Sequence, residues 1–160
     1  MRDTAEILLL ILVANAAPVL ASYFFSHKAS WPIDSDYRLT DGLEIFGADK
    51  TWRGLFASVF VTIVVAWLIG STAIVGLVIS LCAMAGDLIS SFIKRRVGME
   101  PSSRATLLDQ IPESLLPALA SAWFWSIGLI HIIAIVTSFL ILEIILSKIF
   151  FNLGVRKRPH

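Results

Sequence analysis

Two short polar stretches interrupt an otherwise apolar chain, and both contain side chains that can bind phosphate. The first is GADKTWRG at residues 47–54, and the second is GDLISSFIKRRVG at residues 86–98. A lysine presents a compact point charge and an arginine binds two phosphate oxygens at once, so these residue types together predict a site for a nucleoside triphosphate. The candidate cations are Lys50, Arg53, Lys94, Arg95 and Arg96.

The second stretch is expected to end a membrane helix, with its polar residues on one face. Asp87, Ser90, Ser91 and Lys94 follow the spacing i, i+3, i+4 and i+7, which places them along one side of a helix. A charged side chain at the centre of a bilayer costs roughly 2.5–3.5 kcal/mol, so such residues usually face a polar cavity. The alternative is that Asp87 only pairs with a neighbouring cation.

A second carboxylate comes from TLLDQIPE, residues 106–113, where Asp109 precedes a helix that we expect to begin at Pro112. Magnesium at phosphoryl-transfer sites is usually held by one or two carboxylates together with phosphate oxygens and water. Asp87 and Asp109 would suit this role if the chain folds one onto the other. The alternative is that Asp109 is only a polar residue ahead of the helix and Glu113 a first-turn acid favoured by the helix dipole.

Basic residues at a membrane boundary are also ordinary topology signals that contact lipid phosphates. This interpretation is favoured for Lys148 and for residues 156–158, which have no polar motif around them. Lys50 and Arg53 lie instead among acidic, hydroxyl and aromatic residues, which favours a binding role.

The apolar stretches contain three further polar or helix-breaking residues. Asn15 and Pro18 lie in the first of them, and the proline leaves a carbonyl that a neighbouring helix or water must satisfy. Asn15 either lines the polar pocket or belongs to a packing kink. Glu143 lies in the last apolar stretch and either pairs with a loop cation or contributes to an intramembrane path.

Composition gives the class of protein to which these motifs belong. The chain has 160 residues, of which 57% are hydrophobic and 16% charged, so we expect an all-α integral membrane protein in a single domain. Cys82 is the only cysteine, which excludes an intrachain disulfide. Apolar length and the turn signal Gly70-Ser71-Thr72 predict five transmembrane helices, with two polar loops between them. The expected spans are 7–25, 55–69, 73–93, 113–128 and 130–150, and the polar loops are 26–54 and 94–112. The alternative for the first span is a cleaved signal peptide.

The basic residues predict the orientation in the cell membrane. With five spans, every lysine and arginine except Arg2 falls on one side, and the positive-inside rule makes that side the cytosol. The N-terminus is then outside, while the C-terminus and both polar loops are cytosolic. These cations are Lys28, Arg38, Lys50 and Arg53 in the first loop, Lys94, Arg95, Arg96 and Arg104 in the second, and Lys148, Arg156, Lys157 and Arg158 at the C-terminal end.

Six motifs along nearly the whole chain give it a resemblance to the CDP-archaeol synthases, which are membrane cytidylyltransferases. The chain also resembles the larger CDP-diacylglycerol synthases, but MEPSSRATL replaces their glycine-rich segment and Pro112 replaces an acid, which favours the archaeol-type branch. The motifs, in order, are VANAAPVL (13–20), PID (32–34), DG (41–42), FGADKTWRG (46–54), GDLISSFIKRRVG (86–98) and LLDQ (107–110).

This resemblance implies transfer of CMP from CTP to a lipid phosphate of archaeol or phosphatidic-acid type, with release of pyrophosphate. Its implied partners are CTP, a lipid phosphate within the bilayer and the membrane itself, with no nucleic acid. The competing interpretation is a small transporter or channel subunit with an acidic intramembrane path. The resemblance implies Mg²⁺ on Asp87 and Asp109, phosphate contacts from Lys50, Arg53, Lys94 and Arg95, hydrogen bonds from Thr51 and Ser91, and Asn15 in the pocket lining.

Overall fold

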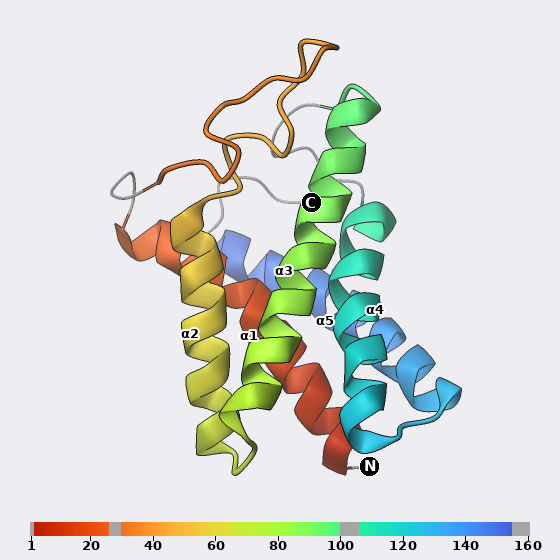
Figure 1. Cartoon of the computed structure of the whole chain (residues 1–160). Helices are drawn as coiled ribbons and strands as arrows, with labels where there is room; N and C mark the ends of the chain where they lie inside the picture. The colour runs from red at the N-terminus through yellow and green to blue at the C-terminus, as the bar shows by residue number, and fades with distance from the viewer. Residues whose placement is uncertain (1, 26–29, 100–105, 155–160) are drawn as a thin grey trace.

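The computed structural model is all-helical and describes residues 2–25, 30–99 and 106–154 (Figure 1). Lys28, Arg104 and residues 156–158, which entered the charge count, lie outside these ranges. Within the described residues the chain forms five helices and no strand beyond isolated bridges. The helices are α1 (Arg2–Phe25), α2 (Trp52–Leu68), α3 (Ala73–Arg96), α4 (Thr106–Trp125) and α5 (Leu129–Asn152).

Three of these helices, α1, α3 and α5, are long and apolar enough to cross a membrane, while α2 is a shorter apolar helix. The helices overlap the five predicted spans. The clearest difference lies at the second polar loop, which was predicted over 94–112. The structure continues α3 to Arg96 and begins α4 at Thr106, so Asp109 lies inside the first turn of α4 and not ahead of it.

Helices α1 and α2 meet where the proline interrupts α1. Pro18 has no N–H, so the carbonyl of Ala14 loses its usual donor one turn along the helix. The hydroxyl of Ser58 in α2 donates to this carbonyl at 2.8 Å. Beside this contact, a Cβ on Gly54 would lie 3.2 Å from the Cβ of Pro18, so the two helices pack closely here. The neighbouring-helix donor expected for a proline break is thus present.

The α2–α3 hairpin forms where Gly70-Ser71-Thr72 was expected to turn. Gly70 adopts a φ of +83°, and the hydroxyl of Thr72 caps α3 by accepting from the Val75 N–H at 3.4 Å. Such a positive φ favours glycine because it has no Cβ to clash. Gly76 then brings the helices together, since a Cβ there would lie 2.8 Å from the Cα of Ile63.

Helices α3 and α4 approach each other even more closely. A Cβ on Gly86 would lie 2.2 Å from the carbonyl oxygen of Pro112 and 2.7 Å from the nitrogen of Glu113. Any side chain at position 86 would therefore push the two backbones apart. This contact fixes the position of Asp87, the next residue in α3, relative to Glu113 in α4.

An apolar core joins all five helices. Its side chains are almost fully buried, and in Figure 1 α1 and α5 cross obliquely behind α2, α3 and α4. The core holds the bundle together so that the polar residues of α3 and α4 keep a fixed geometry. It consists of Ile7, Leu10 and Ile11 from α1, Ala66 from α2, Val75 and Ile79 from α3, Ala118 from α4, and Ile132, Ile135 and Phe139 from α5.

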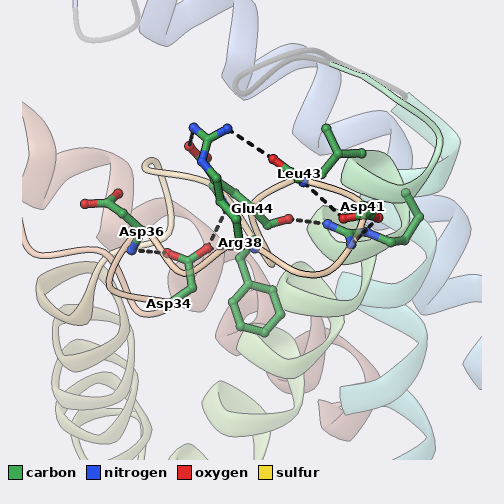
Figure 2. Close-up of polar contacts among 10 residues, drawn as sticks. Asp34, Asp36, Arg38, Asp41, Leu43 and Glu44 are labelled. Atoms are coloured by element: carbon green, nitrogen blue, oxygen red, sulfur yellow. Dashed lines mark hydrogen bonds and ion pairs between the residues drawn. The ribbon is translucent and has the colours of Figure 1, made fainter.

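Residues 30–51 form a folded loop beside the C-terminal end of α3, and we call this segment the α1–α2 loop (Figure 1). Asp34 organises it: the carboxylate accepts from the backbone N–H groups of Phe46 at 2.9 Å and Gly47 at 3.0 Å (Figure 2). Burial acts to raise the pKa of Asp34, but these bonds and one from Asp36 outweigh it and hold the pKa below its ordinary value. The loop is therefore folded around an ionised carboxylate.

Candidate active site

Lys50 and Asp87 form the central contact of the site. The lysine ends the α1–α2 loop, just before α2, and Asp87 lies in the second half of α3. The Nζ atom of Lys50 donates to both carboxylate oxygens of Asp87, at 2.5 and 2.6 Å. The loop reaches this position because the Ile33 N–H donates to the Lys50 carbonyl at 2.7 Å and the Trp52 N–H donates to the Trp31 carbonyl at 3.1 Å.

A second lysine–carboxylate pair lies one to two turns further along α3. The Nζ atom of Lys94 lies 2.7 Å from Oδ1 of Asp109, and both side chains are largely buried. This pair joins the last turns of α3 to the first turn of α4. Lys94 also interacts electrostatically with Asp87, so the two pairs belong to one cluster. The two aspartates expected to converge do lie close to the same lysines.

Glu113 is the member of this cluster that the sequence did not single out. Its carboxyl group shares a hydrogen bond with Asp87. Glu143 of α5 also interacts electrostatically with Glu113, so the last helix brings a further acid toward the cluster. The signal in the sequence is the spacing of the two acids. If α4 is predicted to begin at Thr106, Glu113 lies four residues after Asp109 and therefore on the same helix face.

The charge of Lys50 follows from its acidic neighbours. Burial acts to lower the pKa of Lys50, but the carboxylates of Asp87, Glu113 and Asp109 together hold that pKa above its ordinary value. Lys50 is therefore a cation at neutral pH, although it is enclosed by protein. A buried cation with several carboxylates around it can move to an incoming anion without changing its protonation state.

Arg53 and Thr51 lie at the first turn of α2, next to Lys50. The guanidinium of Arg53 donates from Nη2 to the hydroxyl of Ser22 in α1 at 3.0 Å. The hydroxyl oxygen of Thr51 accepts from the Gly54 N–H at 3.2 Å and so caps α2. In this structure Arg53 links the start of α2 to α1, and Thr51 caps the N-terminus of α2.

Three predicted site residues lie in α3 and are buried: Ser91, which was expected on the helix, and Lys94 and Arg95, which were expected in the polar loop 94–112. Lys94 and Arg95 are 8% and 5% exposed, and Ser91 is 2% exposed. The side chain of Arg95 lies beside Gly47 of the α1–α2 loop. Within the described part of the chain the Ser91 hydroxyl has no hydrogen-bond partner, so it can still bond to a ligand.

Asn15 makes a contact within its own helix. Its Nδ2 donates to the carbonyl of Ile11 at 3.0 Å, one turn earlier in α1. The packing-kink interpretation of this region accounts for that bond and for the contact between Ser58 and Ala14. A place for Asn15 in the pocket lining stays a prediction.

The residues of the cluster fit magnesium only together with a polyphosphate. Within residues 2–25, 30–99 and 106–154, no three histidine, cysteine or acidic residues are grouped so that they could hold a metal ion by themselves. Mg²⁺ usually takes one or two carboxylates and completes its shell with phosphate oxygens and water. Asp87 and Asp109 offer such a partial set, and in this structure Lys50 and Lys94 neutralise their charges.

Comparisons with known proteins agree with this arrangement. A family model described as "CarS-like: CDP-archaeol synthase" matches residues 68–160. A solved structure described as an intramembrane enzyme for archaeal membrane lipid biosynthesis is 29% identical, has a TM-score of 0.70, and aligns over 86% of this chain and 88% of its own length.

Three curated relatives carry the name CDP-archaeol synthase. That of Sulfurisphaera tokodaii is 33% identical and covers 92% of this chain and 89% of the relative. That of Staphylothermus marinus is 29% identical, with 92% and 86% covered. That of Hyperthermus butylicus is 40% identical over a shorter stretch, 62% of this chain and 60% of the relative.

These matches confirm the resemblance seen in the motifs. They also confirm the prediction of a multi-pass membrane enzyme and favour it over a transporter or channel subunit. The family model alone covers more than half of the chain, including the second half of the site, from α3 through α4. The chain belongs to the CDP-archaeol synthase family.

Proposed function

We propose that this protein transfers CMP from CTP to an archaeol-type lipid phosphate, giving a CDP-activated lipid and pyrophosphate. The observation that carries the proposal is the Lys50–Asp87 contact within a cluster of lysines and carboxylates. The family to which the chain belongs supplies the substrates, because the curated relatives are named for CDP-archaeol synthesis.

In the proposed reaction an oxygen of the lipid phosphate attacks the α-phosphorus of CTP. The bond between this phosphorus and the bridging oxygen to the β-phosphate breaks, and pyrophosphate leaves with the electron pair. A phosphate monoester is already an anion at neutral pH, so the reaction needs no strong general base. Positioning of the two phosphates and neutralisation of their charge therefore carry most of the catalysis.

The cations of the cluster have the roles that this reaction needs. Lys50 and Arg53, at the start of α2, and Lys94 and Arg95, at the end of α3, bind phosphate oxygens and stabilise the charge on the leaving pyrophosphate. Lys50 exchanges its carboxylate partner for a phosphate when CTP arrives. The hydroxyl of Ser91, buried on the same helix face, donates a hydrogen bond to the bound triphosphate.

Asp87 and Asp109 would hold Mg²⁺, and Glu113 keeps Asp87 in position through their hydrogen bond. When bound, the metal ion would supply charge neutralisation at the phosphates. Lys50 and Lys94, which pair with these carboxylates in the empty site, would then be available to the substrate.

The location of the site matches a reaction between a water-soluble and a membrane-bound substrate. We propose that the α1–α2 loop and the C-terminal end of α3 face the cytosol, where CTP is present, and that the N-terminus is outside. The support is the asymmetry of the basic residues along the chain. The lipid tails remain in the bilayer and the phosphate reaches the cluster from between the helices.

A direct assay tests the function. Purified protein in detergent would be supplied with radiolabelled CTP, Mg²⁺ and either an archaeol-type phosphate or phosphatidic acid. We expect a labelled CDP-lipid from the archaeol-type acceptor and none after the substitution Asp87→Asn. Product from phosphatidic acid alone would show that the acceptor has acyl chains and not archaeol-type chains. No product with either lipid would contradict the proposal.

A further inference from the structure

Arg96, the last residue of α3, connects that helix to the middle of the α1–α2 loop. Its Nη1 donates to Oδ2 of Asp41 at 2.6 Å, and its Nη2 donates to the backbone carbonyl of Glu44. The guanidinium also lies over the ring of Phe92, with 5.2 Å from Cζ to the ring centroid. The sequence grouped Arg96 with the phosphate-binding cations, but in the structure its two terminal nitrogens are used to hold the loop.

The part of the loop that Arg96 holds is itself well ordered by local bonds. Arg38 donates to the Gly42 carbonyl at 3.1 Å and to the Glu44 carboxylate at 3.2 Å. The Leu43 N–H donates to Oδ1 of Asp41 at 3.0 Å, so one carboxylate oxygen orders the turn while the other receives Arg96 (Figure 2). The segment 38–44 is therefore cross-linked by its own hydrogen bonds, and Arg96 attaches it to α3.

This segment is connected to Lys50 by a short and ordered stretch of backbone. The carboxylate of Asp34 binds the N–H groups of Phe46 and Gly47, and the Gly47 carbonyl accepts from the Lys50 N–H at 3.1 Å. A shift of the loop at Arg96 would therefore act on the backbone next to Lys50. That backbone is also held by the Ile33 N–H, which donates to the Lys50 carbonyl at 2.7 Å, so the contact at Arg96 adds to this local restraint.

Two hydrogen-bonded contacts between the loop and α3 lie roughly 13 Å apart along the helix axis at a rise of 1.5 Å per residue, in addition to the packing of Arg95 beside Gly47. One contact is Lys50 on Asp87 and the other is Asp41 and Glu44 on Arg96. The first would open in the proposed reaction, because Lys50 turns from Asp87 to a phosphate of CTP and Asp87 would then be available to hold the metal ion. The second involves no group that the reaction uses, so it can stay closed.

We propose that Arg96 is a positioning residue that keeps Lys50 at the active site after its contact with Asp87 has opened. The ion pair with Asp41 holds the α1–α2 loop on α3 throughout the reaction, and Lys50 therefore reaches the triphosphate without a search by a free loop. Holding a catalytic group in place lowers the entropy lost on binding. This inference rests on the proposed function, in which Lys50 binds a phosphate of CTP.

A first experiment measures the loop without any substrate. Hydrogen–deuterium exchange of the full-length protein in detergent would compare Arg96→Ala and Asp41→Ala with the wild type. We expect exchange of the backbone amides in residues 38–50 to rise roughly tenfold in both variants. Lys148→Ala, which removes an exposed cation from α5, is the matched control and should leave the loop unchanged.

A second experiment measures kinetics in a double-mutant cycle with Arg96→Ala, Asp41→Ala and the double variant. We expect KM for CTP to rise roughly 3- to 10-fold in each single variant, and the double variant should rise no further than Arg96→Ala, since that substitution already removes the ion pair with Asp41. Arg96→Lys keeps a cation opposite Asp41 and should recover part of the loss. Asp41 is exposed, so its alanine variant tests the idea even if Arg96→Ala does not fold.

The two readouts separate this inference from the proposed function. If the backbone amides of the loop exchange at the wild-type rate in both Arg96→Ala and Asp41→Ala, the positioning role of Arg96 is overturned. This holds whether or not the enzyme makes a CDP-lipid. A loss of turnover in Arg96→Ala with normal kinetics in Asp41→Ala would identify Arg96 as a phosphate ligand and would also overturn it. Absence of CDP-lipid in the wild type would contradict the proposed function. The exchange data would still decide whether Arg96 holds the loop.

Discussion

The ammonium of Lys50 bridges the two carboxylate oxygens of Asp87, at 2.5 and 2.6 Å, across a sequence separation of 37 residues. This contact joins the segment before α2 to the middle of α3, and it brings together the two polar motifs that stand out in the sequence. Both side chains are mostly enclosed by protein. Substitutions at either residue therefore affect stability and activity in different ways.

Removing Lys50 alone should destabilise the protein, while removing both charges should not. Lys50→Met leaves the Asp87 carboxylate without its nearest cation, which costs about 3–5 kcal/mol for a fully buried pair and less here because both side chains are partly exposed. We expect thermal unfolding in detergent to show a lower Tm for Lys50→Met and a recovered Tm for the double variant Lys50→Met/Asp87→Asn. Neither variant should make CDP-lipid. Equal Tm values for the single and double variants would show that the contact is not a stabilising pair.

Gly86→Ala should separate α3 from α4. The added Cβ would lie 2.2 Å from the Pro112 carbonyl oxygen, and because the obstacle is backbone it cannot rotate away. Overpacking of this kind costs about 1–3 kcal/mol or more, and the shift would also break the alignment of Asp87 with Glu113. Tm and turnover should both fall. Gly128→Ala is the control, since a Cβ there meets no atom within 4 Å, and a similar loss in that variant would argue against a local clash.

Glu113→Gln should reduce turnover more than it reduces stability. The amide is close in size to the carboxyl group and can still form a hydrogen bond with Asp87, so the packing of α4 on α3 is preserved. The proton that the two carboxyl groups share is replaced by a fixed amide N–H, so Glu113 can no longer exchange a proton with Asp87 when phosphates bind. A measurement of kcat, KM for CTP and Tm separates these effects. A variant with full activity would show that Glu113 has only a packing role.

The α1–α2 loop should loosen in acid through Asp34. Because the backbone bonds hold the pKa of Asp34 below its ordinary value of 3.8, the stabilisation is present above that value and is lost as pH falls through the pKa in the folded protein. Protection factors, which correct the exchange rates for the intrinsic effect of pH, should therefore fall in residues 34–47 of the wild type below about pH 4. Asp34→Asn should show fast exchange already at pH 7 and a weaker dependence on pH. An identical pH profile in both proteins would remove Asp34 from this role.

Ser58→Ala should destabilise the contact between α1 and α2. The substitution leaves the Ala14 carbonyl with neither its helical donor, which Pro18 lacks, nor the serine hydroxyl. An unsatisfied buried acceptor costs about 1–3 kcal/mol, so we expect a lower Tm. Ser80→Ala is a suitable control because its hydroxyl donates to Leu77, a carbonyl of its own helix. Equal effects of the two substitutions would contradict a special role for Ser58.

Local signals in the sequence were enough to predict several parts of this fold. The turn at Gly70 follows from a flexible residue next to a helix-capping threonine, and the shared face of Asp87 and Lys94 follows from helical spacing. The convergence of Lys50 with Asp87 was expected from charge and orientation. The pairing of their atoms was not, because it depends on how the α1–α2 loop folds around Asp34.

The errors arose where a local signal had two possible consequences. Proline favours the first turn of a helix, which predicts a start of α4 at Pro112, yet the helix begins at Thr106 and includes both Pro112 and Pro117. The same signal offers Glu113 as no more than a first-turn acid. Arg96 could not be distinguished from its neighbours by residue type, since only its contact with Asp41 across 55 residues shows what it binds.

The pairing of Lys50 with Asp87 and of Lys94 with Asp109 has a consequence for the empty protein. Once the helices have packed, each of these two carboxylates has a counterion within the chain before any nucleotide or metal ion arrives. Neither position therefore carries the desolvation cost of an unpaired charge while the site is empty.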